Sequence, residues 1–280
     1  MSTSLPSDDR VDATVHQVRC ETDLLPDHDI LGVSAPNPGP FTLSGTNTWL
    51  VGRSPTFLID PGPLIDEHLE HLFVAIEARG GLGGVALTHD HRDHSEAVEA
   101  LLARHPAPLA AGRGKVDVTL AEGVGFGPFQ AVFTPGHAPD HFALVGHGAC
   151  FTGDAVLGAG SVFISPHPGA MSGYLLALSR LRLREDFELL CPGHGPLVWN
   201  ARAKLDEYID HRLDREKRLI MALGEGRRTV DELLDAVWSE VPGVLRGAAT
   251  ATLAAHLDKL DDDALLPERV ERPSFAGAEW

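Results

Sequence analysis

The stretch Val85-Ala86-Leu87-Thr88-His89-Asp90-His91-Arg92-Asp93-His94-Ser95 carries more information on fold and chemistry than any other part of this chain. Three histidines and an aspartate form the pattern H-x-H-x-D-H directly after an apolar run. A carboxylate placed among imidazoles gains nothing from burial in an apolar core. Imidazole nitrogens and carboxylate oxygens do suit zinc and similar divalent ions as ligands. The pattern therefore predicts a metal site at His89, His91, Asp93 and His94 rather than a solvated polar loop.

Length and charge limit the classes of protein that fit. A chain of 280 residues has room for one large domain, or for a domain of roughly 200 residues and a smaller one. Its 43% hydrophobic and 22% charged residues are typical of a soluble globular protein. The formal net charge of −17 disfavours nonspecific binding to nucleic acid or to an anionic membrane through the overall field.

The cysteines and the N-terminal segment point to a cytoplasmic protein. Cys20, Cys150 and Cys191 lie far apart and form no CxxC pair, so we expect small buried hydrophobes rather than a disulfide framework or a thiolate zinc site. Residues 1–10 are polar and acidic, which predicts that no signal peptide is present. No run approaches the roughly 20 apolar residues that a membrane span needs.

Strand and helix patterns alternate along the first two hundred residues. Apolar runs bounded by turn residues predict strands, whereas apolar residues at helical spacing, as at Leu69, Leu72, Phe73 and Ile76, predict helices. The strands are expected at 47–51, 57–60, 85–87, 131–134, 142–145, 150–152 and 187–191, and the helices at 66–79, 95–104 and 172–184. This alternation predicts an α/β sandwich with helices on its outer faces.

The composition changes near residue 200. Residues 201–223 have a long helical pattern, and Thr229 with Glu232 forms a capping-box sequence that opens a second helix, through residue 238. A third helix is expected over residues 248–260. The chain is therefore divided into a catalytic domain over 1–200 and a helical subdomain over 201–280.

Three later turns each place a candidate ligand after a strand. His137 follows Thr134-Pro135-Gly136, Asp154 follows Thr152-Gly153, and His194 lies between two glycines. Glycine allows the backbone to approach an ion closely, while the sheet fixes the side chain. Together with the first cluster, these turns predict one metal centre built from several strand ends.

In motif order the chain resembles the metallo-β-lactamase superfamily from about Asn47 to Pro196. The resemblance rests on Asp60 in Leu-Ile-Asp-Pro-Gly, the H-x-H-x-D-H cluster, and the three later turns. It implies an αβ/βα sandwich with a dinuclear metal site at one edge. It also implies these roles: His89, His91 and His137 hold the first metal, Asp93, His94 and His194 the second, Asp154 bridges them, and Asp60 orients a ligand imidazole. We expect His141 to support the ligands from behind, or to make a strand-edge contact.

The same resemblance predicts hydrolysis without a covalent intermediate. A hydroxide shared by two cations is nucleophilic near neutral pH, and the cations polarise the carbonyl or phosphoryl group under attack. Asp93 and Asp154 are the expected catalytic carboxylates. Two divalent ions per chain are implied, with zinc expected first and manganese or iron as alternatives.

Finer similarity points to one group within the superfamily. Residues 45–52, 134–144 and 152–158 resemble the β-lactamase-like proteins, a group that includes a mitochondrial endoribonuclease and ends in a winged-helix-like subdomain. DNA binding is not expected here, because a recognition helix should be rich in Arg, Lys, Asn or Gln. Residues 246–263 instead carry Arg246 and Lys259 against four aspartates, Asp258, Asp261, Asp262 and Asp263. A packing module or an oligomer contact is the alternative role for this subdomain.

Two residues near the predicted centre are candidates for a substrate pocket. His167 lies in the loop between Asp154 and the predicted helix from residue 172, and Tyr174 could donate a hydrogen bond to an oxyanion. Ordinary packing roles are the alternative for both. The leading hypothesis is a di-metal hydrolase of a small ester or thioester. An endoribonuclease acting on single-stranded RNA and a non-catalytic metal-stabilised scaffold stay open as alternatives. A homo-oligomer stays open under every one of these functions.

Overall fold

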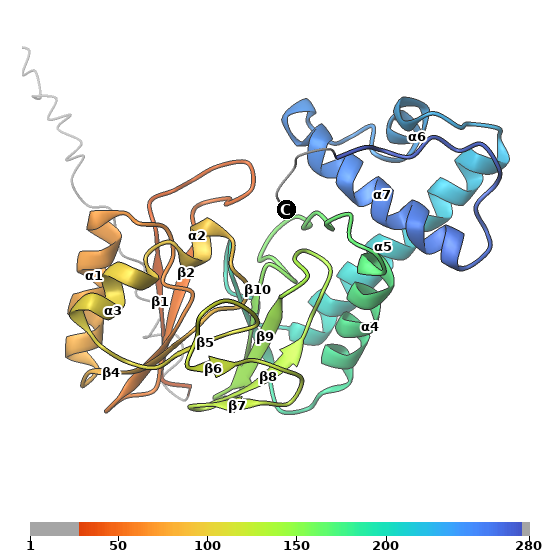
Figure 1. The fold of residues 1–280 in the computed structure, drawn as a ribbon. Coiled ribbons are helices and arrows are strands. Elements are labelled where there is room, and N and C mark those ends of the chain that lie inside the picture. The colour runs from red at the N-terminus through yellow and green to blue at the C-terminus, as the bar shows by residue number, and fades with distance from the viewer. Residues whose placement is uncertain (1–27, 276–280) are drawn as a thin grey trace, which may run out of the picture.

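The computed structural model describes residues 28–275 and shows two β-sheets that face each other, with helices on the outer sides (Figure 1). In spatial order, the first sheet contains β1 (Ile30–Ser34), β2 (Asn47–Val51), β3 (Thr56–Ile59), β4 (Leu82–Ala86), β5 (Leu109–Ala111) and β6 (Val118–Thr119). The second contains β11 (Leu189–Pro192), β10 (Ala149–Gly153), β9 (Phe142–Gly146), β8 (Phe129–Phe133) and β7 (Gly125–Phe126). The predicted αβ/βα sandwich is confirmed.

Helical crossovers set the strand directions in the first sheet. The connections from β1 to β3 are short and the strands pair antiparallel. Helix α1 (Asp66–Ala78) joins β3 to β4, and α2 (Arg92–Ser95) with α3 (Val98–Arg104) joins β4 to β5. Strands β3 to β6 are parallel, with helical crossovers from β3 to β4 and from β4 to β5 and a loop over residues 112–117 from β5 to β6.

Strand periodicity divides the core into layers. Trp49, Val51 and Ile59 of the first sheet point toward Phe129 and Phe151 of the second, and form the layer between the sheets. The alternate residues on the same strands form the outer layer beneath α1 and α3. That layer contains Leu50, Leu58, Val85, Leu69, Leu72, Phe73, Ile76 and Leu101.

Two helices cover the second sheet in the same way. Helix α4 (Ala170–Leu183) and the first half of α5 (Ala201–Gly224) pack their apolar faces on β8 to β11. Tyr174, Leu178, Leu205 and Tyr208 are the main helical contributors to this layer. The sandwich is thus closed on both outer faces, and only its edges remain for a functional site.

The C-terminal part forms a separate helical core. The second half of α5 packs with α6 (Val230–Val237) and α7 (Arg246–Asp262), and the short 3-10 helix η2 (Gly243–Leu245) directly precedes α7. The predicted capping box is present, because Thr229 accepts from the Glu232 backbone and the Glu232 carboxylate accepts from that of Thr229. Residues 201–275 contain helices but no strand, so the β-wing of a winged helix is absent from this described part.

Two further expectations concern the cysteines and the membrane. Cys150 and Cys191 are buried, as predicted, whereas Cys20 lies outside the described residues. Within residues 28–275, no helix combines the length and the apolar character needed to cross a membrane.

Candidate metal centre

Loops that follow four strands bring the candidate ligands to one edge of the sandwich. The H-x-H-x-D-H segment follows β4, and His137, Asp154 and His194 follow β8, β10 and β11. Their donor atoms form three compact groups: His89 with His91 and His137, His89 with His94 and Asp154, and Asp93 with His94 and His194. All seven residues predicted as ligands therefore lie within one cluster.

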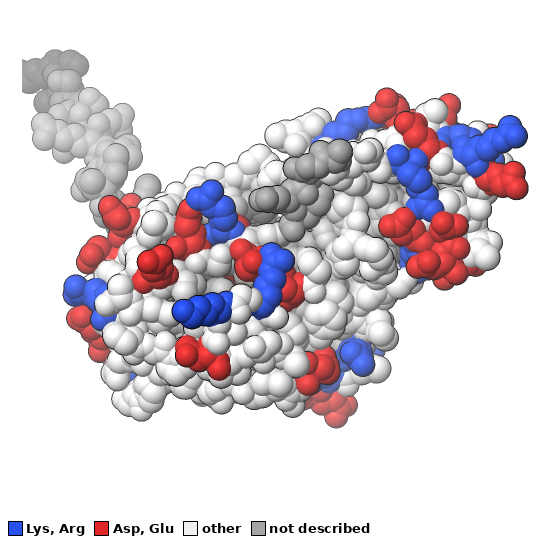
Figure 2. Space-filling model, in the orientation of Figure 1, with Lys and Arg blue, Asp and Glu red and all other residues white. Residues whose placement is uncertain are grey.

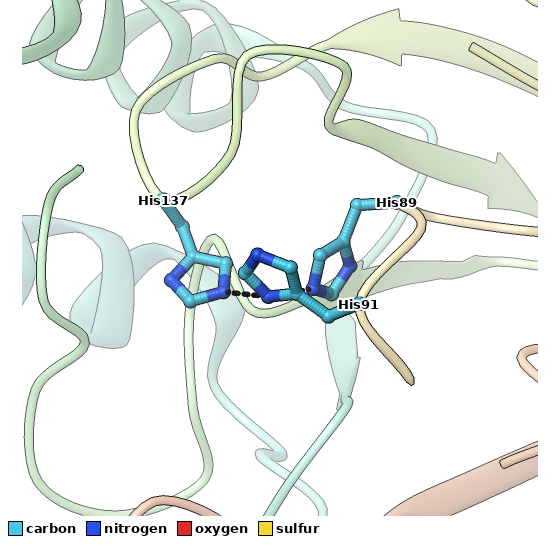
Figure 3. Close-up of side chains that lie close together, drawn as sticks. All are labelled: His89, His91 and His137. Carbon is cyan, nitrogen blue, oxygen red and sulfur yellow. Dashed lines mark hydrogen bonds between the residues drawn. The ribbon is translucent and has the colours of Figure 1, made fainter. Parts of the chain in front are cut away.

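The first group is shown in Figure 3. Nδ1 of His91 lies 3.0 Å from Nε2 of His89 and 3.0 Å from Nε2 of His137. Nδ1 of His137 faces the Phe163 carbonyl at 3.3 Å and must donate to it. Nδ1 of His89 lies 3.0 Å from the Thr88 hydroxyl, which itself donates to Asp60, so this nitrogen also donates.

These tautomers leave the two Nε2 atoms without protons. Lone pairs of His89 and His137 then converge on Nδ1 of His91, which can donate to only one of them. Converging lone pairs in a buried place are unfavourable unless a donor or a cation lies between them. Three neutral imidazole nitrogens in this arrangement are a suitable ligand set for a zinc-like ion.

The second group contains Asp93, His94 and His194. Nδ1 of His194 donates to the Gly45 carbonyl at 3.2 Å, which leaves Nε2 facing the Asp93 carboxylate at 3.2 Å. Nε2 of His94 is fully buried and has no hydrogen-bond partner among the described residues. It lies 3.6 Å from Oδ2 of Asp93. A cation among these atoms would satisfy the unpaired nitrogen.

Asp154 lies between the two groups. Its Oδ2 is 3.5 Å from Nε2 of His137 in the first group and 3.3 Å from Nε2 of His194 in the second. Its Oδ1 lies 3.6 Å from Nε2 of His94 and has no hydrogen-bond partner in the described part of the chain. Asp154 is therefore close to donors of both groups, and the bridging role that the resemblance implies stays a prediction.

Gly193 leaves the space that the ligands need. A Cβ at this position would lie 2.6 Å from Oδ1 of Asp154 and 2.7 Å from Cε1 of His94. Such distances are shorter than real contacts, so any side chain here would enter the centre. The ligand set, the two unpaired buried atoms and this space together fit two divalent metal ions.

Two buried residues, Asp60 and His141, hydrogen-bond to ligand residues from behind. Oδ2 of Asp60 accepts from Nδ1 of His94 at 3.0 Å, and its Oδ1 accepts from the Thr88 backbone at 2.8 Å. Nε2 of His141 accepts from the Asp154 backbone at 3.1 Å, while its Nδ1 donates to Thr134 at 2.7 Å. Hydrogen bonds of this kind fix ligand tautomers and orientations.

Burial and charge set the protonation of the cluster. Burial lowers the pKa of the His89 imidazole well below its usual range and that of His137 to about 4, so both are neutral at pH 7, as ligands must be. Burial opposes ionisation of Asp154, but His194 and His94 hold the pKa of this carboxyl well below its usual range. Burial also disfavours the His194 imidazolium, yet Asp154 and Asp93 raise its pKa to about 9. A cation in the second group would displace such protons.

Sequence reasoning missed a carboxylate at the rim of the centre. Asp140 is buried, lacks hydrogen bonds to both oxygens, and lies 3.4 Å from Nε of Arg113. Arg113 also pairs with Asp90, inside the H-x-H-x-D-H segment. Burial raises the pKa of Asp140, with a further contribution from Asp90. The only sequence signal for Asp140 was its place between His137 and His141.

The two candidate pocket residues lie outside the cavity, and Tyr174 packs behind the ligand loops, against Gly136. Tyr174 is fully buried under the sandwich, and its hydroxyl donates to the Ala155 carbonyl at 2.6 Å. The ring of His167 lies 2.6 Å from the Ser165 hydroxyl. Neither residue lines the cavity of about 320 Å³ that opens beside His137 and Asp154. The Tyr174 hydroxyl is therefore engaged with the protein backbone and is not available to a substrate oxyanion.

Known proteins share both the sequence and the fold of this chain. A β-lactamase-like protein 2 homologue of Caenorhabditis elegans is 32% identical over 265 residues, covering 87% of this chain and 86% of that protein. An atrochrysone carboxyl ACP thioesterase of Aspergillus chevalieri is 35% identical over 234 residues, covering 76% of this chain and 74% of the relative. No family model matches the chain.

A solved structure supports the assignment at the level of fold. A β-lactamase domain protein from Burkholderia ambifaria superimposes with a TM-score of 0.73 at 20% identity, covering 84% of this chain and 86% of the other. The sandwich, the ligand cluster at its edge and the sequence relatives agree with one another. The chain belongs to the metallo-β-lactamase superfamily, as a β-lactamase-like metal-dependent hydrolase.

Proposed function

We propose that this protein hydrolyses a small ester or thioester with the help of two divalent ions. The seven ligands would hold these ions, and zinc is the metal we expect first. The observation that carries the proposal is the cavity of about 320 Å³ that begins at His137 and Asp154. Its volume lies in the range of small-molecule sites, which are mostly apolar with a few polar groups.

The walls of this cavity come from three parts of the chain. Phe41 and Leu43 form one side, the segment from Leu157 to Phe163 forms another, and the C-terminal helices form the third. The C-terminal contribution includes Trp238 and Val241, which lie between α6 and η2, and Leu245 and Ala249. Because aromatic and aliphatic side chains dominate the lining, an acyl group suits the cavity better than a polar substrate does.

Single-stranded RNA suits this site less well. Proteins that bind RNA strands present basic grooves with aromatic stacking platforms. Acidic and basic side chains are intermingled on the face shown in Figure 2, where no continuous basic stripe occurs. The net charge of −17 also disfavours binding of RNA, which is itself negatively charged. The thioesterase relative adds support for an acyl thioester.

Each part of the centre has a defined task in this reaction. Bound divalent ions would supply a nucleophile by lowering the pKa of water and would polarise the carbonyl under attack. The histidines and aspartates hold the ions, and Asp60 and His141 keep ligand orientations fixed. The apolar walls exclude bulk water from the acyl group and orient its carbonyl toward the ligands.

The test combines metal content with turnover for the Asp154→Asn variant. We expect about two zinc ions per wild-type chain by mass spectrometry, and turnover of p-nitrophenyl esters or acyl thioesters. Asp154→Asn should lower kcat/KM by at least about 100-fold while the circular dichroism spectrum is unchanged. The exposed Asp210→Asn on α5 serves as the matched control.

Two outcomes would contradict the proposal. Unchanged hydrolysis by Asp154→Asn would remove the assigned role of the bridging carboxylate. Cleavage of labelled single-stranded RNA without any ester or thioester turnover would assign the site to a ribonuclease instead.

A further inference from the structure

A buried arginine forms part of the wall of the cavity beside the metal centre. Arg212 belongs to α5, is only 2% exposed, and lines the same cavity as His137 and Asp154. It is one of the largest fully buried side chains in the described structure. Sequence analysis gave no role to this residue, because α5 follows His194, after the last ligand motif.

The guanidinium of Arg212 lacks an acidic partner. Nη2 donates to the Val162 carbonyl, the guanidinium also donates to the Tyr174 hydroxyl, and it lies 5.6 Å from the centre of the Tyr174 ring. Nε is buried without any hydrogen-bond partner, and no carboxylate of residues 28–275 forms an ion pair with this arginine. Neutral contacts of this kind leave a positive charge uncompensated in a largely apolar cavity.

The neighbouring Arg215, in contrast to Arg212, forms an ion pair within the protein. Arg215 lies one turn further along α5 and also lines the cavity. It donates to the Val237 carbonyl and forms an ion pair with Glu240. Buried charges in folded proteins are normally paired in this way. The missing partner of Arg212 is thus expected to come from a ligand.

We propose that Arg212 binds a carboxylate carried by the acyl part of the substrate. The inference rests on the proposed esterase or thioesterase function and narrows its substrate class. The scissile carbonyl lies toward His137 and Asp154, the apolar body fills the cavity, and the second, non-reacting carboxylate pairs with Arg212. A planar guanidinium matches a carboxylate in geometry as well as in charge.

The rest of the lining favours a carboxylate over a phosphate. Glu240 and Asp154 also face this cavity, so a doubly charged group would meet more repulsion than a singly charged one. Only one guanidinium is unpaired, since Arg215 is already neutralised by Glu240. One positive charge thus matches one negative charge.

The first test measures binding of product-like acids to the zinc-loaded full-length protein by isothermal titration calorimetry. Linear dicarboxylates from butanedioate to decanedioate are compared with monocarboxylates of equal chain length. Both kinds of acid offer one carboxylate to the metals. The ratio of their dissociation constants therefore reports only the effect of the second carboxylate. We expect the wild type to bind the best-fitting dicarboxylate roughly 10- to 100-fold more tightly than its monocarboxylate.

Variants of Arg212 identify the group responsible. Arg212→Met, which keeps the length of the side chain, should abolish the preference, and Arg212→Lys should retain part of it. Arg202→Met is the control, because Arg202 lies on the same helix but is half exposed and pairs with Glu185 at the surface. Its preference should equal that of the wild type.

Turnover separates this inference from the proposed function. Acyl thioesters with a terminal carboxylate should lose kcat/KM in Arg212→Met roughly 10- to 100-fold more than their methyl-ester counterparts. An equal loss for both substrates would show that Arg212 only supports the fold, and would overturn the inference. A wild-type protein without preference for any dicarboxylate would overturn it even if Arg212→Met did not fold. A binding preference without thioester turnover would uphold it while rejecting the proposed reaction.

Discussion

At the scale of single residues, Asp60 orients ligands in both groups of the metal centre. Its carboxylate accepts directly from His94 and, through the Thr88 hydroxyl, orients His89. The Asp60 backbone adopts a φ of 51°, which is strained for a residue other than glycine. A hydrogen bond from Thr48 to the Asp60 carbonyl at 2.7 Å helps to hold this conformation. One side chain therefore fixes one ligand from each metal group.

The variant Asp60→Asn tests this role. The amide can accept with one oxygen only, so it cannot serve the Thr88 hydroxyl, the Thr88 backbone and His94 together. We expect zinc affinity to fall roughly 10- to 100-fold, as for other residues behind metal ligands. Competition against chelators of graded affinity measures the change, with Asp210→Asn as the control. Wild-type affinity in Asp60→Asn would show that the ligands orient themselves without it.

His68 supports the same loop, and its lowered pKa predicts that the stability of the fold depends on pH. Its Nε2 donates to the Pro61 carbonyl at 3.1 Å, and burial lowers the pKa of the imidazole to about 4 from 6.5. Between these pH values the unfolded chain binds a proton that the folded chain excludes. The contribution of His68 to the free energy of unfolding is complete above pH 6.5 and falls by about 3 kcal/mol as the pH drops to 4.

His68→Gln isolates this term, because glutamine keeps an N–H donor and does not titrate. Urea unfolding of the metal-free proteins across this pH range should show a steeper loss for the wild type than for His68→Gln. Other titrating groups contribute equally to both curves, so their difference reports His68. Parallel curves would contradict the assigned pKa.

At the scale of elements, the site depends on the short loops after four strands. Each loop places a ligand within a few residues of the end of its strand, so the sheet registers determine the distances between ligands. Gly193, after β11, is where this arrangement is tightest. Its backbone needs no positive φ, so a substitution there tests space alone.

Gly193→Ala should fill the metal centre without straining the chain. The added Cβ would meet Asp154 and His94 at contact distances that cannot be accommodated. We expect the zinc content to fall below about one ion per chain while the far-ultraviolet circular dichroism is retained. Gly224→Ala, at the end of α5 with open space around it, is the matched control and should bind metal normally. Full zinc content in Gly193→Ala would show that the loop moves freely.

Elements with a clear period could be predicted from the sequence, and very short ones could not. Helix α1 and strands β2, β8 and β9 agree closely with the predicted ranges. Strands β5, β6 and β7 have only two or three residues each, too few for an alternating pattern to appear. The helix expected over residues 95–104 is divided into α2 and α3, because the ligand segment itself forms the first turn.

The candidate site shows the same division between local and long-range information. The ligands lie in motifs, where residue type and spacing suffice to predict a metal centre. The cavity combines Phe41, Phe163, Arg212 and Trp238, which are far apart in the sequence and share no pattern. Only packing reveals that Arg212 is buried without an acidic partner, and that Tyr174 faces Ala155 instead of the cavity. The division at residues 200 and 201 stays a prediction, since α5 contributes to both cores.

At the scale of the whole molecule, the helical part completes the cavity of the sandwich. The Thr252 hydroxyl of α7 accepts from the buried Ile164 backbone at 3.1 Å and donates to the Ala248 carbonyl at 3.0 Å. Ile164 directly follows the segment that forms one cavity wall. This hydrogen bond ties that wall to the last helix.

Thr252→Val tests the connection with almost no change in volume. The variant leaves the Ile164 N–H buried and unpaired, which should lower the free energy of unfolding by about 1–3 kcal/mol. The wall should also loosen, so KM for an acyl substrate should rise while kcat changes less. Thr250→Val is the control, because that hydroxyl bonds only to the Arg246 carbonyl within its own helix. Equal effects of both variants on unfolding and on KM would contradict a specific role for Thr252.

The order of the ligands along the chain also has a consequence during translation. A chain emerging from the ribosome N-terminus first presents the H-x-H-x-D-H segment early, yet the ligand set is incomplete until His194 has emerged. The segment from Trp238 to Leu245 and helix α7, which line the cavity, are made only afterwards. The full ligand set thus leaves the ribosome before the residues that cover the cavity, so ions from solution can reach the ligands without passing that wall.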